Sequence, residues 1–221
     1  MTYGPDEFAK EFGISREVAD RFGIYDATLL EWSSRHNLVS RSTIEDRWSR
    51  HYRDSAQLYR RIPSDAKTLL DLGSGAGFPG LVLAVMGAER KLEVSLVESI
   101  GKKAAFLSAA AEAMALKTVS VIPERIESIT IYPPDIVTAR ALAQLGKLLG
   151  YAHEIAGERT TMLFPKGQDV EVELTDAAKY WHMDVVKHPS VTSPGSTILE
   201  IRRLRPVRRQ FSVGTRKSRE K

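Results

Sequence analysis

Residues 68–80, TLLDLGSGAGFPG, decide the fold of this 221-residue chain. The apolar stretch from Thr68 to Leu72 predicts a short strand, and four of the next eight residues are glycine. An apolar run at 81–86 then predicts a helix. A glycine-rich loop between a strand and a helix lets backbone N–H groups face a bound anion or nucleotide, because no Cβ blocks the approach. The stretch therefore predicts a ligand-binding loop rather than an ordinary turn.

This loop fits the patterns of two ligand classes. The pattern G-x-G-x-x-G from Gly75 to Gly80 is the dinucleotide fingerprint, which is a weak signal when it stands alone. The pattern D-x-G-x-G-x-G from Asp71 to Gly77 is typical of loops that bind adenosylmethionine. A carboxylate at Asp71 can receive a ligand ammonium or hold the loop, and it would repel the pyrophosphate of NAD. The loop lacks the lysine of a P-loop.

Strand and helix patterns alternate along the chain from residue 67 onward. The predicted strands are 67–72, 92–97, 118–122, 135–139 and 160–165, and the predicted helices are 81–86, 102–116, 141–156 and 168–180. Two further apolar runs, 183–188 and 197–204, flank a turn that contains proline and glycine and predict a terminal antiparallel pair. This alternation predicts a Rossmann-like α/β fold, doubly wound around a mainly parallel sheet, with the ligand at the carboxyl ends of the strands.

The residues before this domain predict a helical extension. Ser15 can cap a first helix, because apolar residues recur after it at helical spacing. Thr43 followed by Asp46 resembles a capping box and predicts the start of another helix. The expected division of the chain is a helical extension at 1–65, a class I-type α/β domain at 66–205 and a basic, disordered tail at 206–221.

Composition narrows the possible functions. Cysteine is absent, which excludes disulfides, thiolate zinc sites and cysteine nucleophiles together. No apolar run reaches the ~18 residues of a membrane span, and the N-terminus lacks a signal-peptide core, so a cytoplasmic protein is expected. The histidines show no metal-ligand spacing, so no metal site is expected.

Basic residues gather in two places. Residues 202–221 hold nine Lys and Arg against one Glu, whereas the rest of the chain holds 23 basic and 27 acidic residues. The region from Arg35 to Arg61 holds seven arginines against three acidic residues. Basic segments on a mildly acidic body predict a polyanionic partner, and such charges raise affinity for RNA without selecting a base. The alternative is a solvated tail that keeps the protein soluble.

Polar residues follow the predicted strands at the edge where a ligand should lie. Glu98 follows the second strand, where a carboxylate accepts hydrogen bonds from two ribose hydroxyls. Arg140 follows the fourth, and an arginine without an obvious general base suits methylation of a ring nitrogen, whose lone pair is already free. His51, Asp54 and Ser55 share one predicted helix without a nucleophile elbow, so they predict a polar contact or a domain joint rather than a triad.

Several short motifs occur together in one order. They are Asn37-Leu38-Val39-Ser40, Arg50-His51-x-x-Asp54-Ser55, DLGSGAGFPGLVLA at 71–84, Glu98-Ser99-x-x-Lys102-Lys103, Arg140-Ala141 and Lys166-Gly167. The set closely resembles the bacterial 16S rRNA guanine-N7 methyltransferase family, also called glucose-inhibited division protein B (GidB), over about 27–204. The resemblance implies a class I methyltransferase fold. It also implies methyl transfer from adenosylmethionine to N7 of a guanine in the decoding-region hairpin of 16S rRNA.

The resemblance and the loop pattern together assign roles to individual residues. The expected cofactor-binding residues are Asp71, Gly73, Gly75, Gly77, Phe78, Glu98, Ile126, Glu127 and Arg140, and the expected catalytic residues are Arg140 and Lys166. The implied partner is 16S rRNA or the small ribosomal subunit, and the implied enzyme is a monomer that needs neither metal nor membrane. Two alternatives stay open: an NAD-dependent oxidoreductase, and a non-catalytic RNA-binding protein that kept the methyltransferase fold.

Overall fold

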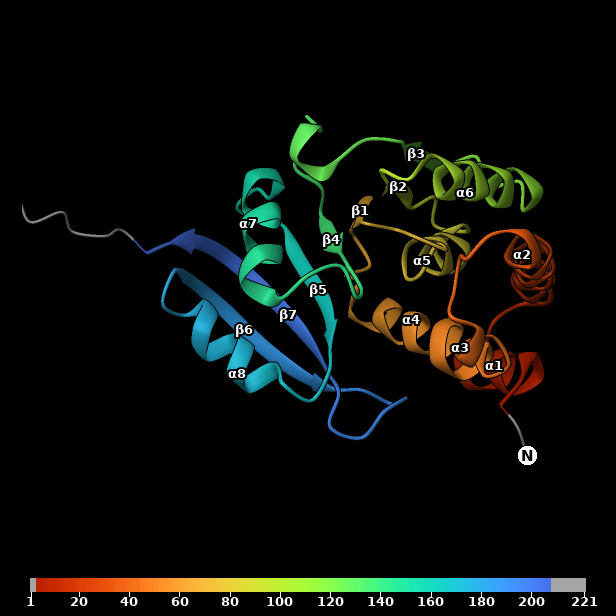
Figure 1. The fold of residues 1–221 in the computed structure, drawn as a ribbon, viewed down its shortest axis with the longest axis horizontal. Helices are drawn as coiled ribbons and strands as arrows, with labels where there is room; N and C mark the ends of the chain where they lie inside the picture. The colour runs from red at the N-terminus through yellow and green to blue at the C-terminus, as the bar shows by residue number, and fades with distance from the viewer. Residues whose placement is uncertain (1–2, 208–221) are drawn as a thin grey trace, which may run out of the picture.

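A computed structural model describes residues 3–207 and shows one sheet between two layers of helices (Figure 1). The seven strands follow the order β3-β2-β1-β4-β5-β7-β6. They are β1 (Thr68–Leu72), β2 (Glu93–Val97), β3 (Val119–Ile122), β4 (Ile136–Thr138), β5 (Thr161–Lys166), β6 (Trp181–Pro189) and β7 (Thr197–Pro206). Strands β1 to β5 are parallel to one another, and β7 is antiparallel to both β5 and β6. The predicted fold class is confirmed.

The helices follow in chain order around this sheet. They are α1 (Pro5–Phe12), α2 (Arg16–Arg35), α3 (Arg41–Ile44), the π-helix η1 (Trp48–Arg53), α4 (Asp54–Ala56), the 3-10 helix η2 (Gln57–Arg61), α5 (Gly80–Gly87), α6 (Gly101–Ala113), the 3-10 helix η3 (Ile126–Ser128), α7 (Leu145–Ile155) and α8 (Val170–Ala177). The Ser15 side chain accepts a hydrogen bond from the Val18 N–H and caps α2, as predicted.

The predicted helical extension includes α1, an eight-residue helix that buries Phe8 and whose start the sequence pattern does not mark. Two details of the helix prediction are wrong. Thr43 does not cap a helix, because its hydroxyl donates to the Ser40 carbonyl and Ser40 itself caps α3. Residues 141–144 are a loop rather than the first turn of a helix, since Ala141 has a φ of 53°.

The basic C-terminal segment is in part a strand. Arg202 and Arg203 belong to β7, where they form ion pairs with Glu200 and Asp184. The rest of the predicted tail, 208–221, lies outside the described residues.

Alternate residues of the strands face the two helix layers. Leu69 and Ile136 pack with α5, α6 and the N-terminal helices, whereas Leu70 and Val137 pack with α7. Because successive side chains of a strand point to opposite faces, a strand covered on both faces is apolar at nearly every position. This burial explains the continuous apolar runs in the sequence.

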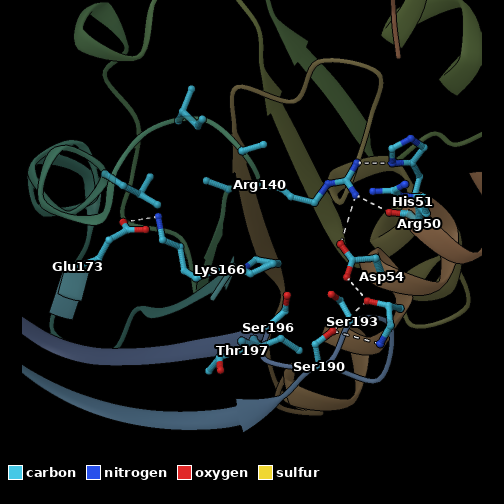
Figure 2. A pocket seen from close by; sticks show the side chains of 18 of the residues that line it. Arg50, His51, Asp54, Arg140, Lys166, Glu173, Ser190, Ser193, Ser196 and Thr197 are labelled. Atoms are coloured by element: carbon cyan, nitrogen blue, oxygen red, sulfur yellow. Dashed lines mark hydrogen bonds and ion pairs between the residues drawn. The ribbon is translucent and has the colours of Figure 1, made fainter. Parts of the chain in front are cut away.

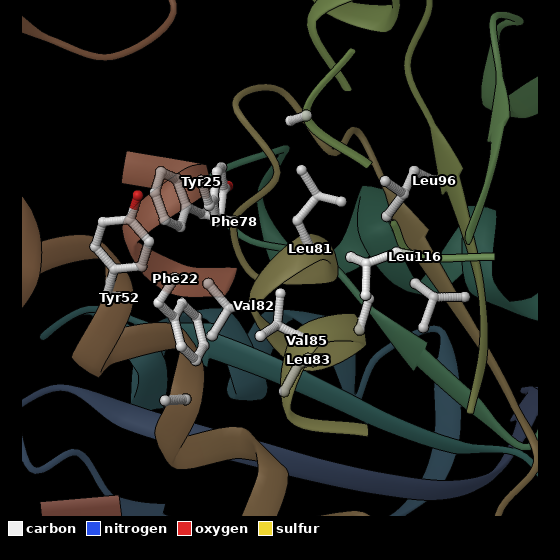
Figure 3. Packing of buried hydrophobic residues seen from close by; sticks show 14 of the residues in the cluster. Phe22, Tyr25, Tyr52, Phe78, Leu81, Val82, Leu83, Val85, Leu96 and Leu116 are labelled. Atoms are coloured by element: carbon white, nitrogen blue, oxygen red, sulfur yellow. The ribbon is translucent and has the colours of Figure 1, made fainter. Parts of the chain in front are cut away.

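Aromatic side chains join the N-terminal helices to the glycine loop (Figure 3). Phe22, Tyr25 and Tyr52 are buried, and the rings of Tyr25 and Tyr52 meet edge to face with centroids 5.3 Å apart. Phe78 of the glycine loop stacks on Tyr25 at 5.6 Å. The Tyr25 hydroxyl also donates to the Ala76 carbonyl within the loop. The extension therefore shares a core with the α/β domain and supports the loop from behind.

Gly80 begins α5 at a point where a side chain does not fit. An added Cβ would lie 2.7 Å from the Asp71 carboxylate and would also overlap Leu96. Gly80→Ala should therefore lower the free energy of unfolding by about 1–3 kcal/mol, as overpacking of a core does. Urea unfolding followed by circular dichroism measures the change.

Gly150 offers a matched control for this substitution. It lies inside α7, and an added Cβ there would have no protein atom within 4 Å. Gly150→Ala should leave stability unchanged or raise it by up to about 1 kcal/mol, because alanine favours a helix more than glycine does. A Gly80→Ala protein as stable as Gly150→Ala would contradict the packing described for α5.

Candidate active site

Asp71, the last but one residue of β1, supports the glycine loop from beneath. Its buried carboxylate accepts hydrogen bonds from the Thr138 hydroxyl at 2.7 Å and from the Gly80 N–H at 3.3 Å. Burial raises the pKa of Asp71 to about 6, although these hydrogen bonds act in the opposite direction. Of the two roles that the sequence leaves open for Asp71, the structure shows that of holding the loop.

A cavity of about 350 Å³, here named the loop cavity, opens at the carboxyl ends of β1 and β2. The residues that line it include Gly73 and Gly75 of the loop, Glu98 after β2, and Ile126 and Glu127 of η3. The structure thus brings five of the nine predicted cofactor-binding residues to one place.

Glu98 connects β2 to the glycine loop. One carboxylate oxygen accepts from the Gly75 N–H at 2.9 Å, and the other accepts from the Ile100 N–H at 2.8 Å. Each oxygen keeps a further lone pair that a ribose hydroxyl can use. Gly75 has a φ of 57°, and an added Cβ would have no protein atom closer than 3.8 Å. The space beside Gly75 is therefore open to a ligand.

Glu127 supplies a second fixed acceptor in the loop cavity. Hydrogen bonds from its own backbone amide and from the Tyr151 hydroxyl lower the pKa of Glu127. The Tyr151 hydroxyl lies 2.9 Å from the Glu127 carboxylate. Ile126, the residue before Glu127, also lines the loop cavity and has an aliphatic side chain. An apolar side chain next to a carboxylate suits the nucleoside end of adenosylmethionine, which has a flat base and N–H and O–H donors.

Gly77 and Phe78 form the part of the glycine loop that faces the N-terminal helices. A Cβ on Gly77 would overlap Leu81 and the Tyr25 hydroxyl. Phe78 is buried, and its ring stacks on Tyr25 and, at 5.0 Å, on His51. Both residues set the course of the loop backbone, and neither lines the loop cavity.

A larger cavity of about 690 Å³, shown in Figure 2, is here named the arginine cavity. It contains Arg140 after β4 and Lys166 at the end of β5, the two predicted catalytic residues. Residues 141–143 line both cavities and so connect them. The other polar residues of the arginine cavity are Arg50, His51, Asp54, Glu173, Ser190, Thr192, Ser193, Ser196 and Thr197.

Arg140 is held by residues of the N-terminal extension (Figure 2). Its Nη1 donates to the Arg50 carbonyl at 3.1 Å and to the Asp54 carboxylate at 3.3 Å, and its Nη2 donates to His51 Nδ1 at 3.1 Å. The guanidinium carbon also lies 5.2 Å from the centre of the Phe78 ring. His51 and Asp54 therefore form a joint to the α/β domain, as the sequence predicts, and not a triad.

Lys166 is paired inside the arginine cavity. Its Nζ lies 2.6 Å from the Glu173 carboxylate and donates to the Ala143 carbonyl at 3.3 Å. Glu173 also accepts a hydrogen bond from the Leu145 N–H at the start of α7. Two of the three ammonium donors are thus in use, and one is left for a ligand.

The turn between β6 and β7 forms one wall of the arginine cavity, which the sequence did not predict. The Thr192 hydroxyl donates to Asp54 at 2.7 Å, and the Gln57 amide donates to the Ser190 hydroxyl at 3.1 Å. Serine, threonine and proline in a turn have an ordinary conformational explanation, so this segment carries no separate signal of a site.

Several arginines of the basic region are bound within the chain. Arg47 makes a bidentate pair with Asp26 at 2.6 and 2.8 Å, and Arg53 pairs with Glu11 at 2.8 Å. These charges fasten the N-terminal helices together and are less available to RNA than their number suggests. Arg50, by contrast, lines the arginine cavity.

Residues 3–207 contain neither a cluster of metal ligands nor a membrane-spanning helix. No group of three or more His, Cys, Asp or Glu side chains in this range could hold a metal ion. No helix in the same range is long and apolar enough to span a bilayer.

The fold is the one that class I adenosylmethionine-dependent methyltransferases share. An O-methyltransferase from Bacillus cereus in complex with SAH shares this fold, with a TM-score of 0.56 and 15% identity over 81% of this chain and 90% of that one. A SAM-dependent methyltransferase from Aquifex aeolicus shares it with a TM-score of 0.54 and 17% identity over 70% and 92%.

The sequence comparisons identify the family within this class. A family model described as rRNA small subunit methyltransferase G, GidB, matches residues 19–202. The ribosomal RNA small subunit methyltransferase G of Paramagnetospirillum magneticum is 46% identical over 94% of this chain and 99% of its own length. That of Rhodospirillum centenum is 44% identical over 90% and 91%. The chain belongs to this family.

Family membership confirms the predicted enzyme class and cofactor. The protein is a methyltransferase that uses adenosylmethionine. The alternative of an NAD-dependent oxidoreductase is therefore wrong.

Asp71 should titrate near pH 6 in the folded protein. Because this pKa lies above the value of about 3.9 for an unfolded aspartate, the folded state binds the proton more tightly. The contribution of Asp71 to stability should fall by ~3 kcal/mol as pH rises from about 4 to about 6 and stay constant above. Carbon-13 NMR of the carboxyl carbon, assigned with Asp71→Asn, gives the midpoint. A midpoint below about 4 would contradict the burial argument.

Gly75→Asn should weaken cofactor binding without unfolding the protein. Asparagine tolerates the left-handed backbone, and its side chain would enter the loop cavity. Affinity for adenosylhomocysteine, measured by calorimetry, should fall at least ~10-fold, which is ~1.4 kcal/mol. Gly13→Asn is the control, because Gly13 has a φ of 59° and open space around its Cβ at the end of α1. Equal affinity in both variants would place the ligand elsewhere.

Proposed function

We propose that this enzyme methylates N7 of a guanine in the decoding-region hairpin of 16S rRNA. The observation that carries the proposal is the arginine cavity, which is polar, holds cations and adjoins the loop cavity through residues 141–143. The names of the relatives supply small-subunit ribosomal RNA as the class of substrate. The side chains of the arginine cavity support guanine as the base.

Guanine presents the acceptors O6 and N7 on one edge. Arg140 and Lys166 can donate to O6 or to an adjacent phosphate and so orient that edge. N7 carries a free lone pair and no proton, so its methylation requires no general base. Methylation of a pyrimidine carbon would require a nucleophile, usually cysteine, and the chain has none.

Methyl transfer to N7 then depends mainly on the alignment of two reactants. Bound adenosylmethionine supplies an electrophilic methyl group on a sulfonium, and N7 supplies the lone pair. The Asp54 and Glu173 carboxylates of the cavity are paired with Arg140 and Lys166, so they fix the two cations that would hold the base. The residues of this chain then need only to align the base with the methyl group.

The loop cavity is the proposed cofactor site. Glu98 would accept hydrogen bonds from the ribose, Ile126 and Glu127 would contact the nucleoside, and the loop from Gly73 to Gly75 would lie along the ligand. Arg140 lines the arginine cavity next to residues 141–143, which both cavities share, and keeps unused donors for the cofactor or the base. Asp71, Gly77 and Phe78 would act indirectly, by holding the glycine loop.

We further propose that the enzyme is a monomer that acts in the cytoplasm on the small ribosomal subunit or its RNA and needs no metal ion. Sedimentation velocity of the purified protein, alone and with the RNA, tests the monomer. A dimer of the free protein at micromolar concentration would count against it.

The methylated product tests the proposal directly. Labelled methyl from adenosylmethionine should appear in small-subunit rRNA as 7-methylguanine only, which nuclease digestion and mass spectrometry can establish. Methyl on a ribose oxygen, an exocyclic amine or a pyrimidine carbon would refute the assignment.

Arg140→Ala should lower turnover about 100-fold or more, as the loss of one preorganised donor does. Lys179→Ala is a matched control, because Lys179 pairs with Asp176 on the surface after α8. Single-turnover kinetics on small-subunit rRNA measure both variants. Full turnover by Arg140→Ala would remove Arg140 from the reaction.

A further inference from the structure

We propose that His51 is a positioning residue of the active site, which acts by orienting the Arg140 guanidinium through its Nε2–H tautomer. The functional part of this inference rests on the proposed role of Arg140 in methyl transfer. It is carried by a chain of hydrogen bonds that starts at Arg140 and ends in the backbone of the N-terminal extension.

The donor and acceptor of each hydrogen bond between Arg140 and Ser40 can be assigned from the two ends of the series. A guanidinium can only donate, so in the 3.1 Å contact with Arg140 Nη2 the His51 Nδ1 must be unprotonated and accept the hydrogen bond. The ring proton must then lie on Nε2, which is 3.0 Å from the Thr43 hydroxyl oxygen. The Thr43 hydroxyl in turn donates to the Ser40 carbonyl at 3.0 Å. Each donor points away from Arg140, and a single tautomer satisfies every link.

The surroundings of His51 keep it neutral. Burial, followed by the positive charges of Arg140 and Arg50, lowers the pKa of His51 to about 4. Its Nδ1 is therefore available as an acceptor at neutral pH. The ring also stacks on Phe78 at 5.0 Å, which fixes its plane.

Asp54 holds the other side of the Arg140 guanidinium. Its Oδ2 accepts from Arg140 Nη1, while its Oδ1 accepts from Thr192 at 2.7 Å and from Gln57 at 3.0 Å. Nη1 thus uses both of its hydrogens, with Asp54 and with the Arg50 carbonyl. These contacts leave the Nε–H and one Nη2 hydrogen of Arg140 for a ligand.

The arrangement gives the N-terminal extension a direct part in the active site. The π-helix η1 contains His51 and is followed at once by Asp54, and both side chains reach Arg140. Single turns of π-helix occur frequently at functional sites. The motifs at 37–40 and 50–55, which lie far in sequence from Arg140, meet it in this one chain of hydrogen bonds.

The tautomer can be measured without any substrate. Nitrogen-15 NMR of the imidazole at pH 7, assigned with His51→Asn, should show Nδ1 unprotonated and Nε2 protonated in the wild-type protein. In Arg140→Ala the Nδ1 resonance should shift, because its donor is gone. A proton on Nδ1, or an Nδ1 resonance that ignores Arg140→Ala, would overturn the inference whatever the substrate of the enzyme is.

Kinetics of three variants then test whether the orientation matters. His51→Phe keeps a ring on Phe78 and removes the acceptor, so kcat/KM should fall roughly 10- to 100-fold, as for loss of a hydrogen bond to a charged group. His51→Asn restores an acceptor oxygen near the place of Nδ1 and should recover activity to within about threefold of wild type. His153→Phe, at the Trp181 contact outside both cavities, should keep full activity.

A double variant separates positioning from a general structural effect. In an Arg140→Ala background, His51→Phe should cause no further loss, because the two residues act as one unit. Independent losses that multiply, or a His51→Asn enzyme as weak as His51→Phe, would overturn the inference. Wild-type protein that methylates no small-subunit rRNA would instead defeat the proposed function, and the NMR result would still decide the tautomer.

Discussion

The buried carboxylate of Asp71 is the contact on which the rest of the site depends. It joins the end of β1 to β4 through Thr138 and to the first turn of α5 through the Gly80 N–H. The loop between β1 and α5 is then held again, by Glu98 at Gly75 and by Tyr25 from α2 at the Ala76 carbonyl. Because separate elements fix one short loop, the cavity along its surface is preformed, and a ligand need not order the loop when it binds.

The N-terminal helices complete the edge of the sheet where the two cavities lie. An appended RNA-binding arm would keep its arginines free and would leave the α/β domain whole without it. Here Arg47 and Arg53 are paired within the extension, and Phe78 of the glycine loop lies among aromatic rings from α2 and η1. Arg140 donates three hydrogen bonds to residues of the extension. The position of the guanidinium thus depends on helices more than eighty residues earlier in the chain.

The features of the site that were predictable from the sequence follow from local rules. Glu98 and Gly75 are found in one cavity because both stand at the end of a strand, and parallel strands end at one edge of a sheet. Local rules also explain the errors. Alanine has a high helix propensity, so the sequence predicts a helix from residue 141. In the structure Ala141 has a left-handed backbone conformation, because it lies in the loop between β4 and α7. The contact of Thr192 with Asp54 spans 138 residues, and no local pattern encodes it.

A ternary complex would test the central claim, that one cavity holds the cofactor and the adjoining one holds the guanine. The measurement is a crystal structure of the protein with adenosylhomocysteine and guanosine monophosphate. The account predicts the nucleoside of adenosylhomocysteine beside Glu98 and Ile126, and guanine in the arginine cavity with its N7 edge toward residues 141–143. Adenosylhomocysteine in the arginine cavity, or guanine bound away from Arg140 and Lys166, would contradict it.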